Sequence, residues 1–239
     1  GFHFFKGAPF QNWLVYYPVE RFLSRYTDVL ICINEEDYQR AKKKFHAKKV
    51  VKIPGVGIDI EKIQRISINK EEKRKEFDIR KDQIVLLLVG EMTKNKNHKL
   101  LIEVLAKLQD DNVIGVFCGH GQEEQHLRQL AKELHVEERI RFLGYRQDVL
   151  EIYQIADIFV FPSLREGLSV AVMEAMASGL PVVCSRVRGN TDLVKDEELL
   201  VSPTDAEGFC KAISRVLSDN EYRNSLKKKN RETVKDFDK

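Results

Sequence analysis

Short apolar runs alternate with amphipathic stretches along most of the chain. From residue 84 onward, all runs except the one at 181–184 are followed by stretches whose apolar residues recur at helical spacing. The runs predict strands at 84–90, 113–119, 140–144, 158–162, 181–184 and 199–201, and the stretches predict helices at 99–108, 123–134, 149–156, 168–177, 206–217 and 222–234. Strands that are apolar on both faces and alternate with helices indicate a doubly wound α/β fold with a parallel sheet.

The first part of the chain follows the same alternation over a shorter length. It predicts a helix at 19–26, a buried strand at 28–34, a polar helix from Glu35 and a short strand at 50–54. Gly55 and Gly57 suit a flexible crossover, and a charged surface helix follows between residues 69 and 81. One convincing strand is too little for an independent sheet. We therefore interpret residues 1–54 as the remnant of a first domain and residues 55–239 as a more complete second one, in a chain expected to be a fragment.

Composition limits the classes of function. The chain has 239 residues, of which 43% are hydrophobic, and its net charge of +3 is too small to indicate a nucleic-acid binder. Residues 1–52 are locally basic, which fits either an anionic membrane surface or a solvated helix face at 40–44. The sequence shows no signal peptide and no run long enough to cross a bilayer, so we expect a cytoplasmic protein that can lie on a membrane. Four cysteines without metal or redox spacing are expected to be buried thiols, namely Cys32, Cys118, Cys184 and Cys210.

The strongest chemical signal lies between residues 163 and 183. Glu166 is expected in a loop at the carboxyl end of a strand, which is where doubly wound sheets bind ligands. Gly167 allows the backbone to approach a ligand closely. Free N–H groups at the start of the following helix form an anion site that fits a diphosphate; they belong to Leu168, Ser169 and Val170.

Glu174 lies about two turns along this predicted helix. A buried carboxylate needs hydrogen-bond donors, and a ribose diol offers two. Alternatively, Glu174 shares a solvent-facing stripe with Ala171 and Ser178. The spacing permits both interpretations.

Glu166 and Glu174 together resemble the E-x7-E signature of family 4 retaining glycosyltransferases, which have the GT-B fold. The resemblance implies that Glu166 contacts the donor sugar and Glu174 the ribose. It continues in order through nearly the whole chain, in a domain crossover at 54–59, a phosphate loop at 89–97 with Gly90 and Lys96, a glycine-rich turn at 118–121 with Gly121, a base-reading loop at 141–146 with Tyr145 and Arg146, and a closing loop at 190–193. Residues 1–9 are similar to a stretch in members that make exopolysaccharide or capsule.

The resemblance implies a Rossmann-like C-terminal domain, the remnant of a Rossmann-like N-terminal domain, and a specific reaction. A sugar would move, with retained anomeric configuration, from a nucleotide-diphosphate sugar, with a UDP-sugar as the expected donor. The acceptor would be a lipid-linked sugar or an oligosaccharide in bacterial surface polysaccharide synthesis. Lys96 and Glu166 would be catalytic, and no metal or other cofactor is expected, because Lys96 and the helix start would stabilise the leaving diphosphate.

One position departs from the family pattern. Glu91 stands where the family usually has arginine. A carboxylate beside a diphosphate is repulsive. Either a nearby cation carries the stabilisation alone, the candidates being Lys94, Lys96 and Arg165, or the Glu91 side chain turns away.

Weaker signals have simpler interpretations. The turn at 119–121 lacks the third glycine of a dinucleotide fingerprint, which argues against NAD. Asp236 and Asp238 form a D-x-D pattern that we interpret as chance. His3 lies either near the reaction centre or in a cluster of phenylalanines, and four other histidines are expected on the surface, namely His98, His120, His126 and His135.

Two other functions stay open from the sequence. The first is a nucleotide-sugar-binding module without turnover. The second is a GT-B UDP-sugar epimerase, which would need acid–base side chains around the sugar that the sequence does not place.

Overall fold

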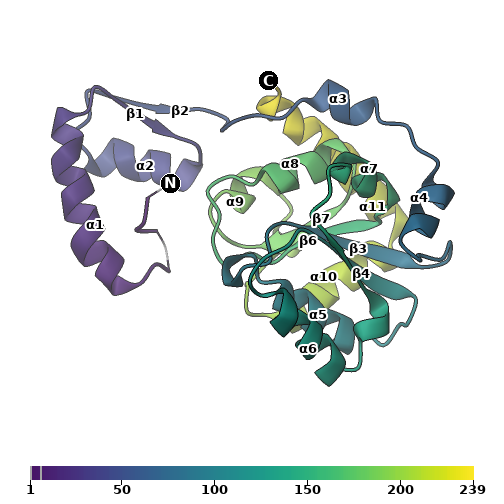
Figure 1. The fold of residues 1–239 in the computed structure, drawn as a ribbon. Helices are drawn as coiled ribbons and strands as arrows, with labels where there is room; N and C mark the ends of the chain where they lie inside the picture. Colours follow the sequence, from purple (N-terminus) through teal and green to yellow (C-terminus); the bar gives the residue numbers. More distant parts are fainter. Residues whose placement is uncertain (1, 6) are drawn as a thin grey trace.

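The computed structural model describes residues 2–5 and 7–239, and it contains two parallel sheets of unequal size (Figure 1). The smaller sheet pairs β1 (Val29–Cys32) with β2 (Lys49–Lys52), and two helices flank it, α1 (Phe10–Leu23) and α2 (Glu35–Lys44). Asn34 starts α2 by accepting a hydrogen bond from the Asp37 backbone N–H with its side chain at 2.8 Å.

The larger sheet has six strands in the order β5-β4-β3-β6-β7-β8, and all neighbours are parallel. The strands are β3 (Ile84–Val89), β4 (Val113–Cys118), β5 (Ile140–Gly144), β6 (Ile158–Phe161), β7 (Val182–Ser185) and β8 (Leu200–Val201). Residues 85–88 of β3 are 0% exposed, because helices cover both faces. The predicted doubly wound α/β architecture is confirmed. The chain reverses its direction of winding between β3 and β6, which places the topological switch point there.

Helices cover the larger sheet on both sides (Figure 1). One side holds α5 (His98–Lys107), α6 (Glu124–Glu133) and α10 (Ala206–Ser218), and the other holds α3 (Ile60–Gln64), α4 (Lys70–Glu76), α7 (Val149–Ile155), α8 (Val170–Ala177) and α11 (Asn220–Thr233). The short α9 (Asn190–Leu193) follows β7. All four cysteines are buried free thiols, as predicted.

The C-terminal end of the chain is fastened to the crossover between the two sheets (Figure 1). The Ile58 N–H donates to the Phe237 carbonyl at 2.9 Å, and the Lys239 N–H donates to the Ile58 carbonyl at 3.1 Å. The Asp238 carboxylate accepts from the Ile60 N–H at 3.1 Å. Asp238 therefore has a local structural partner, which agrees with the chance interpretation of the D-x-D pattern.

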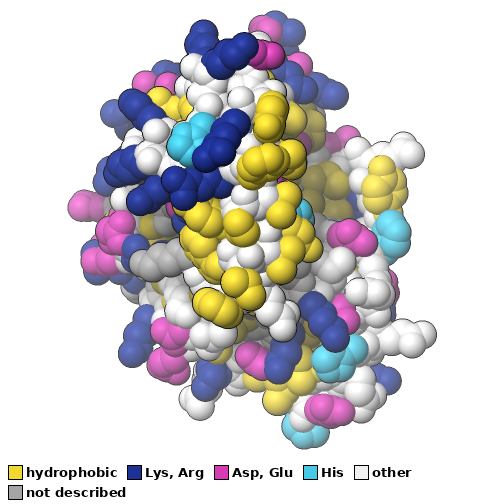
Figure 2. All heavy atoms as spheres, turned by 90° about the vertical axis from the view of Figure 1, so that its left-hand side faces the viewer, with side chains coloured by type: hydrophobic (Ala, Val, Ile, Leu, Met, Phe, Trp, Pro, Cys, Tyr) yellow, Lys and Arg dark blue, Asp and Glu magenta, His cyan; other side chains and the backbone are white. Residues whose placement is uncertain are grey.

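Helix α1 differs from its prediction and exposes a broad apolar face. It begins at Phe10 rather than at residue 19, because Pro18 is accommodated inside the helix instead of marking its start. No residue of α1 is buried, and Phe22 and Leu23 are each 53% exposed. Figure 2 shows hydrophobic side chains gathered in the middle of this face, with Lys and Arg side chains along one flank. Across the part of the chain that the structure describes, no helix has the length and apolar character needed to span a membrane.

Candidate active site

Two loops meet at the switch point of the larger sheet. Residues 90–97 follow β3, and residues 162–169 connect β6 to α8. Because β3 and β6 are parallel neighbours, their carboxyl ends bring these loops together at the edge where ligands bind in such folds. The predicted catalytic residues Lys96 and Glu166 come from one loop each.

The structure brings Lys96 and Glu166 into direct contact. The Lys96 Nζ donates to the Glu166 Oε1 at 2.8 Å, and the two side chains are 25% and 10% exposed. The ammonium also lies 4.8 Å from the centre of the Phe161 ring, a cation–π distance. A Cβ on Gly90 would lie 3.5 Å from the Lys96 Cδ, so the lysine stem runs along this glycine. Lys96 and Glu166 therefore form an ion pair that is partly shielded from water, at the carboxyl ends of β3 and β6.

Two asparagines brace the Glu166 loop from the β3 side. Asn95 accepts from the Leu164 N–H through its backbone carbonyl at 2.8 Å and donates through its side chain to the Arg165 carbonyl at 3.0 Å. The Asn97 side chain donates to the carbonyl of Pro162 at 3.0 Å, and its backbone has a left-handed φ of 55° that asparagine tolerates. Sequence reasoning missed both residues. The sequence offered one sign of them, the alternation of Asn95 and Asn97 with Lys94 and Lys96.

A third loop, after β7, braces Glu166 from the opposite side. The Ser185 hydroxyl donates to the Ser163 carbonyl, and the Arg188 Nε donates to the Glu166 carbonyl at 3.2 Å. Gly189 has a φ of 81°, and a Cβ on it would lie 2.3 Å from the Gly167 carbonyl oxygen. Sequence reasoning missed these residues, since nothing in their local pattern shows which loop they will contact.

The close approach of Gly189 predicts a sharp steric effect. We expect Gly189→Ala to lower the free energy of unfolding by more than the roughly 1 kcal/mol that a strained left-handed φ alone costs, because the new methyl group would overlap the backbone of the Glu166 loop. Gly144→Ala is the matched control: its φ is 67°, but nothing lies within 4 Å of the added Cβ. Chemical denaturation of both variants measures the difference. Equal destabilisation would show that the two loops are not in contact.

Helix α8 begins later than predicted. Its first residue is Val170, and Ser169 is the N-cap, whose hydroxyl accepts from the Val172 N–H at 3.4 Å. The prediction that the helix includes Leu168 and Ser169 is wrong, because serine favours the cap position over the helix interior. Leu168 instead packs against the crossover, where a Cβ on Gly55 would lie 2.8 Å from its Cδ2. The backbone N–H groups available to an anion at the start of α8 are therefore those of its first turn, which begins at Val170.

Glu174 faces inward from α8. The hydroxyl of the buried Tyr153 lies within hydrogen-bond distance of two acceptors, the Glu174 Oε2 at 3.2 Å and the Ala171 carbonyl oxygen at 3.1 Å, between which its one hydrogen is shared. Burial raises the pKa of Glu174 above its usual value, although the Tyr153 hydrogen bond opposes this shift. Among the described residues, no donor reaches the other carboxylate oxygen. These contacts argue against the solvent-facing stripe and leave one oxygen for a ligand.

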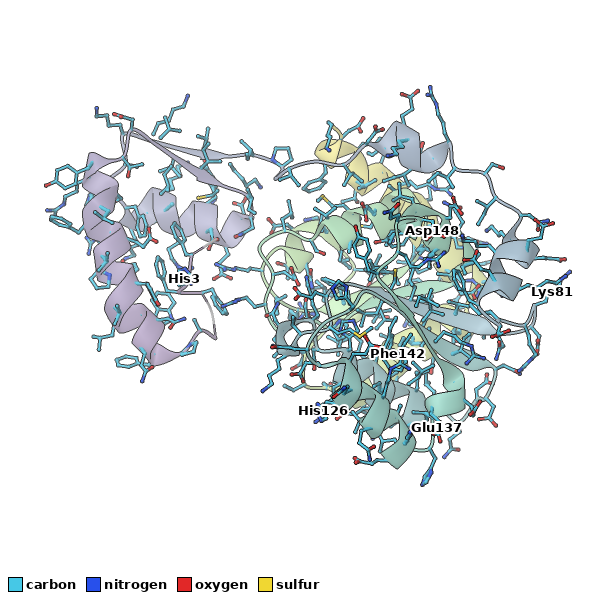
Figure 3. The ribbon with its side chains drawn as sticks, viewed as in Figure 1. His3, Lys81, His126, Glu137, Phe142 and Asp148 are labelled. Atoms are coloured by element: carbon cyan, nitrogen blue, oxygen red, sulfur yellow. The ribbon has the colours of Figure 1, made fainter. Side chains whose placement is uncertain are left out.

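The predicted base-reading loop divides into an open and an occupied part. Tyr145 is 72% exposed, and its ring centre lies 6.0 Å from that of His120 on the neighbouring loop. The Arg146 guanidinium, in contrast, pairs with both Asp148 oxygens at 2.7 and 2.6 Å and with Glu76 at 2.7 Å. The Arg146 hydrogen bond lowers the pKa of Asp148. This side chain is committed to α7 and α4, near the labelled Asp148 of Figure 3, so a base could meet only the Arg146 backbone.

The glycine-rich turn closes against the phosphate loop. A Cβ on Gly121 would lie 2.5 Å from the Met92 carbonyl oxygen, so only glycine fits there. The Gly119 N–H donates to the Gly144 carbonyl at 2.8 Å. These contacts hold the loops after β3, β4 and β5 side by side. The Glu91 side chain, at the position where arginine was expected, is exposed and forms no ion pair with a described residue.

The histidines are placed largely, but not entirely, as expected. His120, His126 and His135 are exposed, and His126 lies on α6 at the outer edge of the larger unit (Figure 3). The prediction for His98 is wrong: it is 1% exposed, because the first turn of α5 directs it under the sheet against Phe117. Burial lowers its pKa to about 4.

His3 lies in the smaller unit beside α1, with its ring centre 4.8 Å from that of Tyr16 (Figure 3). This contact favours the packing interpretation of His3. Within residues 2–5 and 7–239, no three His, Cys, Asp or Glu side chains are grouped so that they could hold a metal ion.

Comparisons with known proteins identify the family. Residues 69–233 match the family described as glycosyl transferases group 1. The chain belongs to this family. Over 99% of its length it is 38% identical to the putative glycosyltransferase EpsD of Bacillus subtilis, and over 86% it is 32% identical to an Escherichia coli UDP-Gal:alpha-D-GlcNAc-diphosphoundecaprenol alpha-1,3-galactosyltransferase. The chain itself spans 64% of the length of the first relative and 55% of the length of the second.

Solved structures confirm the predicted GT-B fold class of the chain. HepE of Anabaena, in complex with UDP and glucose, superposes with a TM-score of 0.83 at 20% identity, covering 98% of this chain and 65% of HepE. The C-terminal domain of the group 1 protein LpcC of Francisella tularensis gives a TM-score of 0.65 at 20% identity, covering 75% of this chain and 97% of that domain. The larger sheet therefore corresponds to a GT-B C-terminal domain.

Proposed function

We propose that the chain binds a UDP-sugar and belongs to a retaining glycosyltransferase that transfers the sugar to a lipid-linked or oligosaccharide acceptor of a bacterial surface polysaccharide. The observation that carries the proposal is the Lys96–Glu166 pair at the switch point, beside the start of α8, the helix on which Glu174 lies. The E. coli relative uses UDP-Gal and an undecaprenol-linked acceptor by its name, and HepE holds UDP. Both support this donor and acceptor class.

The proposed roles are those that the family resemblance implies, and the charge and position of each residue are compatible with them. Glu166 accepts a hydrogen bond from a hydroxyl of the donor sugar, and Glu174 accepts from the ribose. Lys96 and the first-turn N–H groups of α8 face the diphosphate, which becomes more negative as the sugar leaves, so they stabilise the transition state electrostatically. Tyr145 and the Arg146 backbone contact the base, while Gly90, Gly121 and Gly167 allow the chain to approach the nucleotide. Because Glu166 is held by Lys96, we favour attack by the acceptor on the same face of the sugar over a covalent intermediate.

The acceptor is proposed to lie between the two units. We assign residues 1–54 to an acceptor-binding domain and residues 55–239 to the donor-binding domain. Cavities open between them in the structure, one of about 600 Å³ lined in part by Phe5, Arg165 and Arg188. The apolar face of α1 and the exposed Lys42, Lys43 and Lys44 nearby suit contact with an anionic membrane, where a lipid-linked acceptor would reside.

The exposed face of α1 predicts self-association of the chain in solution. Leu14 and Phe22 are 65% and 53% exposed, and apolar patches of this kind drive association. We expect size-exclusion chromatography with light scattering to show species larger than a monomer, and Leu14→Ser with Phe22→Ser to restore the monomer. Vesicles with anionic lipids should compete with this association. A wild-type chain that stays monomeric and ignores vesicles would contradict both roles of α1.

Donor binding is expected to be independent of divalent metal. Lys96 and the α8 backbone are fixed charges and dipoles that can hold a diphosphate. Calorimetric titration of UDP should give the same dissociation constant in EDTA as in magnesium or manganese. A strong metal requirement would mean that the diphosphate does not rest on these groups.

A transfer assay separates the proposed function from its alternatives. Radiolabelled UDP-sugars are incubated with the protein and a membrane lipid extract, and labelled lipid and labelled nucleotide are both followed. Transfer to lipid supports the proposal, a change in the donor's own sugar identifies an epimerase, and donor binding with neither identifies a binding module. For this 239-residue chain we expect donor binding without transfer, because the smaller unit, to which we assign the acceptor, has a sheet of two strands, β1 and β2, among the described residues.

A further inference from the structure

Arg188 lies at the junction between the smaller unit and the loop that carries Glu166. Its side chain is 5% exposed. The guanidinium donates from Nε to the Glu166 carbonyl at 3.2 Å, from Nη1 to the Asp37 Oδ1 at 2.7 Å, and from Nη2 to the Phe2 carbonyl at 2.8 Å. One side chain therefore joins the backbone of the proposed sugar-binding loop to two segments of the smaller unit.

Asp37 is a fixed anchor for this arginine. It is 2% exposed, and its second oxygen accepts from the Asn34 side chain at 3.0 Å and from the Phe2 N–H at 3.4 Å. Asp37 also lies in the first turn of α2, where the helix dipole favours a negative charge. The position of the Arg188 guanidinium is thus set by the smaller unit as well as by its own loop.

The burial of the pair makes these contacts interdependent. A buried guanidinium without its carboxylate is strongly unfavourable, since it has lost water and its counter-charge together. If the smaller unit moved away, Arg188 would lose Asp37 and the Phe2 carbonyl. It would then turn toward water and release the Glu166 carbonyl. The contacts of Asn95, Asn97 and Ser185 would still hold residues 162–165 of the loop, but the Glu166 backbone, and with it the direction of the Glu166 side chain, would lose its contact with Arg188.

We propose that Arg188 is a positioning residue that couples the docking of residues 2–52 to the orientation of Glu166, and so to recognition of the donor's sugar. This inference rests on the proposed function in one respect, that Glu166 contacts the sugar. Lys96 and Glu174 meet the diphosphate and the ribose from other elements. Loss of the Arg188 contacts therefore weakens binding of the sugar and leaves binding of UDP unchanged.

Calorimetry of paired ligands tests the proposal. Affinities for UDP and for UDP-glucose, UDP-galactose and UDP-N-acetylglucosamine are measured for the wild-type chain, and the tightest UDP-sugar is taken forward. Arg188→Met and Asp37→Asn should each weaken that UDP-sugar by roughly tenfold, as expected for one charged hydrogen-bonding interaction, with UDP unaffected. The double variant should lose no more than either single variant, because both changes remove the same link. Arg186→Met is the matched control, an exposed arginine on the same loop that pairs with Glu197.

A general loss of structure would weaken UDP and UDP-sugar equally, and that result overturns the proposal. Unchanged UDP-sugar affinity in both variants also overturns it. Arg188→Lys keeps the charge but cannot reach all three acceptors, so its UDP-sugar affinity should fall between those of wild type and Arg188→Met. Thermal unfolding of each variant shows that it is folded.

Hydrogen exchange tests the coupling through Arg188 in the absence of any nucleotide sugar. In the ligand-free chain, Arg188→Met and Asp37→Asn should speed the exchange of backbone amides in residues 163–169, while β3 and β6 stay protected. Unchanged exchange in this loop would overturn the coupling. If the wild-type chain binds no UDP at all, the proposed function fails, and the exchange result still decides whether Arg188 couples the two units.

Discussion

Replacing Lys96 with methionine is expected to weaken binding of UDP by roughly ten- to a hundredfold, the usual effect of losing a charge-assisted hydrogen bond. Methionine keeps the unbranched stem that runs along Gly90 but removes the ammonium that faces the proposed diphosphate site. The dissociation constant is measured by calorimetry at low and high salt. The difference between wild type and variant should shrink at high salt, because the contact is electrostatic.

Two neighbouring lysines serve as references for this variant. Lys99→Met removes an exposed charge paired with Glu103 on α5 and should leave UDP affinity unchanged. Lys94→Met tests the alternative that another cation of the phosphate loop carries the charge stabilisation. If Lys94→Met weakens UDP and Lys96→Met does not, Lys96 serves only to hold Glu166.

Replacing Glu174 with alanine is the second substitution with a large expected effect. The carboxylate has one oxygen fixed by Tyr153 and one without a partner among the described residues, and we expect the second to accept from the ribose. UDP should bind roughly ten- to a hundredfold more weakly to the variant. Titration with 2′-deoxy-UDP and 3′-deoxy-UDP locates the contact. The ribose hydroxyl that Glu174 binds should matter for wild type and have no effect in Glu174→Ala.

The raised pKa of Glu174 adds a pH dependence with a definite sign. The ionised carboxylate is a stronger acceptor for the ribose hydroxyl than the protonated carboxyl group, so UDP affinity should fall as pH decreases through this pKa. The fall should occur at a higher pH than for an ordinary glutamate, because burial disfavours the charged form. It should be absent in Glu174→Gln. A pH profile that is identical in wild type and Glu174→Gln would remove Glu174 from the site.

The burial of Glu174 also predicts how the free energy of unfolding depends on pH. A glutamate whose pKa is higher in the folded than in the unfolded state lowers stability above that pKa, and the penalty disappears as pH falls below the unfolded value. Glu174→Gln should therefore be more stable than wild type near neutral pH, with the advantage lost in acid. Such a variant, more stable but a weaker binder, would mark a residue kept for function.

The strands of the larger sheet could be predicted from the sequence because each is a short apolar run between helical stretches. Runs such as 84–89 read the same in isolation as in the fold, since both faces are buried. The first residues of the helices were harder to predict from the sequence. The helix predicted from residue 19 begins at Phe10, with Pro18 inside it, and Leu168 has the apolar character of a helical residue but precedes the Ser169 cap.

The candidate site was predictable only where a motif marks it. Lys96, Glu166 and Glu174 stand in patterns that a single sequence can reveal. Arg188 and Asn97 act through contacts with residues that lie far away along the chain, at Asp37 and Pro162, and no local periodicity encodes such contacts. The burial of His98 depends on the direction in which the first turn of α5 points, which polarity alone does not give.

A crystal structure of the chain with UDP bound would show whether the nucleotide lies at the switch point of the larger sheet. We predict a diphosphate between the Lys96 ammonium and the first turn of α8, a ribose within hydrogen-bond distance of the Glu174 carboxylate, and a base beside Tyr145. Nucleotide bound elsewhere, for example in the cavity that Lys70, Arg74 and Asp157 line beside α4 and the end of α7, would contradict this placement.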